Sequence, residues 1–225
     1  MLPVDARLVS VNVARVRPNP HRGARPTAID KRPTGGPVEV RAPGSRAHGL
    51  GSGLVGDSIG NRSHHGGDDQ AVYAYAREDL DRWESELGRP LTAGAFGENL
   101  TTRGVDVSGA LVGERWRVGP DVVLQVTDPR IPCSTFRAWM GVRGWLRTFT
   151  LAAVPGAYLR VLTPGHLRAE DRVEVVHRPE HDVTVSLVFR ALTREPQLLP
   201  AILAAEDLPE GTRAMALAGR TFSVG

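Results

Sequence analysis

The chain of 225 residues is long enough for one sizeable domain, or for one domain with a small appendage. It has no run approaching the roughly 20 apolar residues that span a bilayer, and its start lacks the pattern of a secretory signal. We therefore expect a cytoplasmic protein with no membrane partner. The formal net charge is +3, but the arginines are interspersed with acidic residues, which argues against a nucleic acid polymer as partner. A single cysteine excludes an internal disulfide and leaves one free thiol.

Regular patterns alternate with loops in the first half of the chain. Residues 7–16 alternate apolar and polar side chains and predict a strand, and residues 37–42 predict another extended segment. The glycine- and serine-rich stretch 43–61 predicts a long loop containing a turn that ends at Asp57. Apolar residues at spacings of three and four then predict an amphipathic helix over residues 71–88.

The second half of the chain continues with strands and ends in helices. The predicted elements are a hairpin at residues 116–118 and 122–126, a mostly helical segment at 137–156 with Met140, Trp145, Leu146 and Phe149 in the core, and strands at 157–162 and 171–176. We expect a fold that is mainly β with α, in which residues 1–180 form a β-barrel-like or heavily bent sheet. Residues 181–225 are expected to form a small C-terminal helical domain, a three-helix appendage.

Cys133 lies in a loop that follows a β-rich run. Pro129 and Pro132 prevent this loop from continuing as regular strand or helix. A thiolate at this position is a soft ligand suited to Cu(I), zinc or a high-valent metal such as molybdenum, and Arg130 offers a positive charge that favours the thiolate. The alternative is that Cys133 is a small buried hydrophobic residue without chemistry.

The turn at His65, Gly66 and Gly67 is a candidate anion site. The glycines allow backbone amides to approach a phosphate, and His65 could donate a hydrogen bond to it or transfer a proton. The alternative is a polar turn that caps the helix predicted to begin near Ala71, with Asp68 or Asp69 as its N-cap.

Two further polar clusters could belong to the same site. Asp30 and Lys31, the only lysine of the chain, are either a salt-bridged surface pair or an acid and a charge inside a pocket. Asn99 follows Gly97 and Glu98 and is either a pocket residue or part of an ordinary turn. If these loops lie at the same end of the sheet, they converge on the cysteine.

Six motifs in a fixed order make the interpretation more specific. They are AIDK, GLVGD, HHGGDDQAVYAYAREDL, AFGENLTTRGVDVSGALVGERWRVG, TDPRIPC and YLRVLTPG. In this order, over residues 1–180, they resemble the MOSC domain (molybdenum cofactor sulfurase C-terminal domain) family and in particular its YiiM-like bacterial branch. The three C-terminal helices resemble the helical appendage of the same branch.

The resemblance implies a barrel-like fold in which Cys133 binds the molybdenum of the molybdenum cofactor (molybdopterin). It implies an oxidoreductase that reduces N-hydroxylated small molecules, such as N-hydroxylated purine analogues, and thereby detoxifies N-hydroxylated bases. An external electron donor protein is expected, because the chain has no flavin or haem motif. The alternative is a carrier module that holds the cofactor, or sulfur as a persulfide, for another protein. The family is also associated with pyridoxal phosphate binding, and a homodimer is possible.

The resemblance also suggests roles for individual residues. Cys133 would be the metal ligand, Asp30 or His65 would protonate the departing oxygen, and Lys31 would stabilise negative charge. The cofactor-binding residues would be His65, Gly66, Gly67, Asn99, Arg130 and Cys133, with the His-Gly-Gly turn and nearby arginines holding the pterin phosphate.

Overall fold

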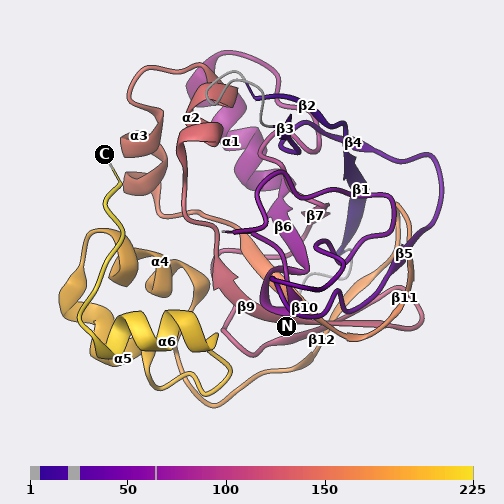
Figure 1. Cartoon of the computed structure of the whole chain (residues 1–225). Helices are drawn as coiled ribbons and strands as arrows, with labels where there is room; N and C mark the ends of the chain where they lie inside the picture. Colours follow the sequence, from indigo (N-terminus) through magenta and orange to yellow (C-terminus); the bar gives the residue numbers. More distant parts are fainter. Residues whose placement is uncertain (1–5, 20–25, 64, 225) are drawn as a thin grey trace.

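The computed structural model describes residues 6–19, 26–63 and 65–224, and it contains a bent sheet with helices gathered at one side (Figure 1). The strands of the main sheet are β1 (Arg7–Ala14), β4 (Lys31–Pro33), β6 (Val72–Ala76), β7 (Leu100–Arg103), β8 (Arg115–Val118), β9 (Val122–Pro129), β10 (Ala157–Thr163) and β12 (Val173–His177). Two small sheets pair β2 (Arg17–Pro18) with β3 (Pro26–Thr27), and β5 (Val38–Val40) with β11 (Gly165–Leu167). The helices are α1 (Arg77–Leu87), α2 (Ser134–Met140), α3 (Trp145–Ala152), α4 (Val185–Thr193), α5 (Leu199–Ile202) and α6 (Glu210–Leu217), with two 3₁₀ turns, η1 (Asp68–Gln70) and η2 (Pro196–Leu198). In these ranges no helix combines the length and the apolar character needed to cross a membrane.

The main sheet is mostly antiparallel and strongly bent. Its strand order is β12-β8-β9-β10-β6-β7-β1-β4, and only β6 and β7 pair in parallel. Irregular pairing in β1, β10 and β12 bends the sheet. The bend brings β1 back to the start of β12, where Arg7 and Arg172 form an isolated bridge and the Leu8 amide donates to the Asp171 carbonyl at 2.9 Å. The predicted fold class is confirmed, although the strands described here form no continuous ladder that closes a barrel.

The helix predicted over residues 71–88 is wrong in its first part. Val72–Ala76 form the central strand β6, and only Arg77–Leu87 are helical. All five strand residues are buried, because Val72 and its alternating neighbours face the sheet core, while Tyr73 and Tyr75 face an aromatic cluster under the helices. A strand that is apolar on both faces has no polar side to reveal its period of two, so the spacing imitates a helix. Asp68 and Asp69 therefore do not cap a helix there but lie in η1.

The segment predicted to be mostly helical forms two helices. Helix α2 ends at Gly141 and α3 begins after Gly144, and both glycines have positive φ, at 64° and 74°. This left-handed conformation ends one helix and redirects the chain into the next. The predicted core residues, Met140, Trp145, Leu146 and Phe149, are all buried. The predicted hairpin is confirmed as β8 and β9.

The C-terminal helices α4, α5 and α6 share an apolar cluster and pack beside β9. Helix α4 is capped by Thr184, whose hydroxyl accepts from the Leu187 amide at 3.0 Å. In α6 the Thr212 hydroxyl donates to Asp128 of β9 at 2.9 Å. After α6 the chain returns to α4, where the Phe222 amide donates to the Leu192 carbonyl at 2.7 Å. The division at residue 180 stays a prediction.

Candidate active site

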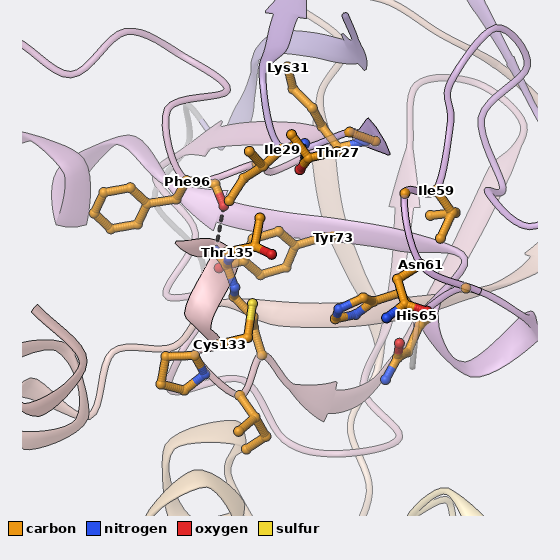
Figure 2. A pocket seen from close by; sticks show the side chains of 18 of the residues that line it. Thr27, Ile29, Lys31, Ile59, Asn61, His65, Tyr73, Phe96, Cys133 and Thr135 are labelled. Atoms are coloured by element: carbon orange, nitrogen blue, oxygen red, sulfur yellow. Dashed lines mark hydrogen bonds between the residues drawn. The ribbon is translucent and has the colours of Figure 1, made fainter. Parts of the chain in front are cut away.

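A cavity of about 560 Å³ lies where loops from several parts of the chain meet. Its lining comes from residues 26–29, 58–61, 65–66, 96–97 and 130–135, joined by single residues from other parts of the chain and by the C-terminal tail. The loops that the sequence was expected to bring together therefore do meet at Cys133. In the view of Figure 2, the Cys133 sulfur lies beneath the Tyr73 ring, with His65 and Asn61 on one side.

Cys133 is the N-cap residue of α2 and lines the cavity. Its side chain is half-buried, and it packs partly against the aromatic cluster under the helices. The interpretation as a wholly buried hydrophobic residue therefore does not fit. In the parts of the chain that the structure describes, no group of three or more His, Cys, Asp or Glu side chains could hold a metal ion. A metal bound through this thiolate would need its other ligands from a bound molecule.

Arg130 places a fixed positive charge beside the cysteine. The side chain is buried, and its guanidinium lies 3.8 Å from the centre of the Phe136 ring and 5.4 Å from that of Tyr73. It donates a 2.5 Å hydrogen bond to the Phe96 carbonyl. Cation–π contacts on two rings and a backbone acceptor hold the charge in one position in the cavity wall.

Lys31 is buried in an ion pair with Asp57, a residue that the sequence analysis placed in a turn and not in the site. Its Nζ lies 2.6 Å from both carboxylate oxygens of Asp57. The same carboxylate accepts from Ser52 at 2.7 Å, from Asn99 at 2.9 Å and from the Ala14 amide at 2.8 Å. Burial would raise the pKa of Asp57, but Lys31 and these donors outweigh it and lower the pKa. The network fixes the lysine at the cavity edge.

Asp30 is not brought to the cavity with the other predicted residues. Its carboxylate is paired with Arg17 at 3.0 Å and with Arg32 at 2.8 Å. It lines instead a separate hollow of about 160 Å³. The suggested role of Asp30 as a proton donor has no support in this geometry.

His65 lines the cavity and is held in its neutral form. Burial, with the charges of Arg130 and Arg46, lowers the pKa of His65 to about 4. At neutral pH the imidazole is almost entirely unprotonated, so it can form hydrogen bonds with a ligand but cannot serve as a ready acid. The following Gly66 also lines the cavity, whereas Gly67 does not, and the Gly67 amide donates to the Gly51 carbonyl at 3.1 Å.

The glycines of this turn are required by the protein's own packing. Gly66 and Gly67 have φ of 87° and 81°, in the left-handed region. A Cβ on Gly66 would lie 2.8 Å from the Gly51 carbonyl oxygen, and one on Gly67 would lie 2.9 Å from the Arg46 nitrogen. The turn therefore positions His65 and Arg46, and only part of it is available to an anion.

The FGENL motif stabilises its own loop through hydrogen bonds to a buried side chain. The buried Glu98 carboxylate accepts from the Gly94 and Phe96 amides at 2.6 and 2.9 Å and from the Thr101 hydroxyl at 2.9 Å. Asn99 lines the cavity, but its side chain accepts from the Tyr73 amide and donates to Asp57 and to the Asn12 carbonyl. Asn99 therefore holds Asp57, the ion-pair partner of Lys31, in position.

Two tyrosines of the site were missed by the sequence analysis. Tyr73 and Tyr158 line the cavity, with ring centres 5.3 Å apart. Tyr73 donates to the Pro155 carbonyl at 2.7 Å. Burial, partly offset by Arg130, raises the pKa of Tyr158 to about 12, so its hydroxyl keeps its proton. Both residues belong to motifs that carried the family resemblance, and that was the available signal.

Comparison with known proteins places the chain in a family. The MOSC domain matches residues 61–174, about half of the chain. YflK of Bacillus subtilis, an uncharacterised protein, is 33% identical over 147 residues, which cover 65% of this chain and 66% of that protein. YiiM of Escherichia coli is 33% identical over 136 residues, covering 59% of this chain and 60% of that protein. A protein of Gibberella moniliformis named "Reductase" is 28% identical over 214 residues, which are 92% of this chain but 36% of that protein.

The fold has a solved counterpart. The crystal structure of YiiM from Geobacillus stearothermophilus superposes with a TM-score of 0.75 at 26% identity, covering 95% of this chain and 98% of that one. The C-terminal helices therefore lie within the shared structure. The chain spans about two-thirds or less of the length of the curated relatives named above.

Proposed function

The chain belongs to the MOSC domain family, and from that premise we propose that it is a molybdenum-cofactor-dependent reductase of N-hydroxylated compounds. The observation that carries the proposal is the position of Cys133, the single thiol of the chain, in the wall of a cavity that also contains Arg130 and Lys31. A soft ligand in a partly open, positively charged cavity suits a metal that enters inside an anionic organic cofactor.

The residues of the cavity fit such a cofactor in size and polarity. Its volume falls in the range of about 300 to 1,000 Å³ that is usual for small-molecule sites. Arg46 and Arg130 supply positive charge for a phosphate, whereas the charge of Lys31 is already neutralised by Asp57. Gln70 also lines the cavity, and its buried Oε1 has no hydrogen-bond partner in the described residues. A buried acceptor without a partner is costly, and the N–H groups of a pterin would satisfy it.

The reaction converts an N-hydroxyl group to an amine. One N–O bond breaks, two electrons and two protons are consumed, and the products are the amine and water. When bound, the cofactor supplies the two-electron chemistry. Cys133 would hold the metal through its sulfur, and Arg130 would orient negative charge beside it. The Tyr158 hydroxyl, which stays protonated, would donate a hydrogen bond to the departing oxygen, and neutral His65 would bind the ligand without transferring charge.

The name of the fungal relative supports a reductase, since nearly the whole of this chain matches one part of that larger protein. The electrons would come from an external donor protein. A carrier of cofactor or persulfide sulfur is the competing function, and it predicts binding without turnover.

The test is reduction of an N-hydroxylated purine by protein purified from a host that makes the cofactor, with dithionite-reduced methyl viologen as electron source. We expect formation of the amine by the wild type and loss of at least 100-fold in Cys133→Ser. Asp30→Asn is the matched control, because its carboxylate lies outside the cavity, and it should keep both metal and turnover. Wild-type protein with a full complement of molybdenum and no turnover would favour the carrier.

A further inference from the structure

The charge of the chain is unevenly distributed around α2 and α3. Between Pro129 and Ala169 there is no aspartate or glutamate. The same stretch contains six arginines, Arg130, Arg137, Arg143, Arg147, Arg160 and Arg168. A stretch of 41 residues with arginines and no acidic side chain favours a local positive surface that the modest net charge does not reveal.

Three of these arginines lie on the outside of the two helices. Arg137 of α2, Arg143 of the connecting loop and Arg147 of α3 are exposed, and none of them forms an ion pair with any residue that the structure describes. The inner faces of both helices pack into the aromatic cluster through Phe136 and Phe149, whose ring centres are 5.1 Å apart. The arginines are therefore left facing solvent on the opposite side.

Two further arginines lie at the ends of these helices, and one of them, Arg194, is paired with Glu195 at 3.2 Å. Arg89 donates to the Met140 carbonyl at the end of α2 at 2.6 Å, and Arg194 donates to the Leu151 carbonyl of α3 at 3.2 Å. Leu151 itself is 56% exposed and lies one helical turn beyond Arg147, so it adds an apolar side chain to the surface. We call Arg137, Arg143, Arg147 and Leu151 the α2–α3 surface.

The α2–α3 surface is close to the candidate metal ligand in sequence and in space. Cys133 is the N-cap of α2, so Arg137 lies one helical turn further, or about 6 Å along the axis. In Figure 1 the two helices lie side by side at one edge of the molecule, away from β11 and β12. A protein seated on this surface would have a short path to a metal held by Cys133.

We propose that the α2–α3 surface is the docking site of an acidic electron-transfer protein that delivers the two electrons of the reaction. This proposal rests on the proposed reductase function. Exposed, unpaired arginines with a single exposed apolar side chain suit a transient complex with a partner of opposite charge, in which electrostatic attraction sets the association rate. A partner that must leave after each electron gains nothing from a large apolar interface.

The test uses two acidic donor proteins, a bacterial flavodoxin and a [2Fe–2S] ferredoxin, and measures binding separately from turnover. The surface variant carries Arg137→Glu, Arg143→Glu and Arg147→Glu. The matched control variant carries Arg115→Glu, Arg168→Glu and Arg172→Glu, which reverse one exposed arginine in β8 and two between β11 and β12; of these, Arg168 lies 3.6 Å from Asp171. Both changes are at exposed positions, and circular dichroism should show that both variants are folded.

The wild type and the control should bind at least one donor at low ionic strength, with an affinity that falls as salt rises. The surface variant should bind it at least tenfold more weakly, while turnover with methyl viologen stays at the wild-type level. Equal binding by both variants, binding of neither donor by the wild type, or tighter binding of duplex DNA with the same arginine dependence would each overturn the proposal. Failure of the reductase function itself would show separately, as no turnover with methyl viologen in any of the three proteins.

Discussion

Replacing Lys31 with methionine should destabilise the fold, because it removes the ammonium that neutralises the buried Asp57 carboxylate. The two side chains are 7% and 0% exposed, and methionine has a similar length. Loss of one partner of a buried ion pair costs about 3 to 5 kcal/mol. Asp57 keeps the hydrogen bonds from Ser52, Asn99 and the Ala14 amide, so we expect a loss near the lower limit, about 3 kcal/mol in the free energy of unfolding.

Urea unfolding of the wild type, Lys31→Met, Asp57→Asn and the double variant measures this coupling. In the wild type the pKa of Asp57 is lowered below its ordinary 3.8, so its stabilisation is present above pH 3.8 and is lost as the pH falls further. In Lys31→Met, burial is less opposed and the pKa of Asp57 rises. The loss in free energy of unfolding that Lys31→Met causes should therefore be largest at pH 8 and should become smaller towards pH 5. A deficit under about 0.5 kcal/mol, or strictly additive effects in the double variant, would refute the buried ion pair.

Three further predictions follow from single residues. Burial raises the pKa of Asp128 to about 7, above its ordinary 3.8, so the wild type should lose stability as the pH rises from about 4 to 7. Asp128→Asn should therefore raise the Tm at pH 8 and leave it nearly unchanged at pH 4, and an equal effect at both pH values would contradict this. Gln70→Leu should lower the pterin content of purified protein several-fold, measured by fluorescence after oxidation, whereas unchanged content would remove Gln70 from the cofactor site. Phe222, which is 39% exposed and lines the cavity, should favour planar substrates. Phe222→Ala should raise the KM for an N-hydroxylated purine at least threefold and leave that for an aliphatic hydroxylamine unchanged; equal changes in both would count against it.

The convergence of loops on Cys133 could be predicted from the sequence, because polar motifs followed apolar runs in an order typical of one family. The ion-pair partner of Lys31 could not be predicted in this way. Asp30 is its neighbour in sequence, but successive side chains of an extended segment point to opposite sides. Lys31 therefore turns to Asp57, 26 residues further along, while Asp30 turns to Arg17 and Arg32.

The strand β6 is a second feature that could not be predicted from the sequence. Its residues are apolar on both faces, so no alternation marked it as a strand, and the arrangement of Tyr73 toward the cavity became clear only in the folded chain. The neutral state of His65 has a similar origin. It depends on Arg130 and on burial, and Arg130 lies 65 residues away in sequence.

The most direct measurement is the molybdenum content of wild-type protein and of Cys133→Ala, by elemental mass spectrometry, after purification from a host that makes the cofactor. Pterin fluorescence is measured on the same samples. We predict close to one molybdenum per chain in the wild type and almost none in the variant, with both proteins folded. Equal metal in the two proteins, or none in either while a known cofactor-binding protein from the same host is fully loaded, would contradict the assignment of Cys133 as the metal ligand.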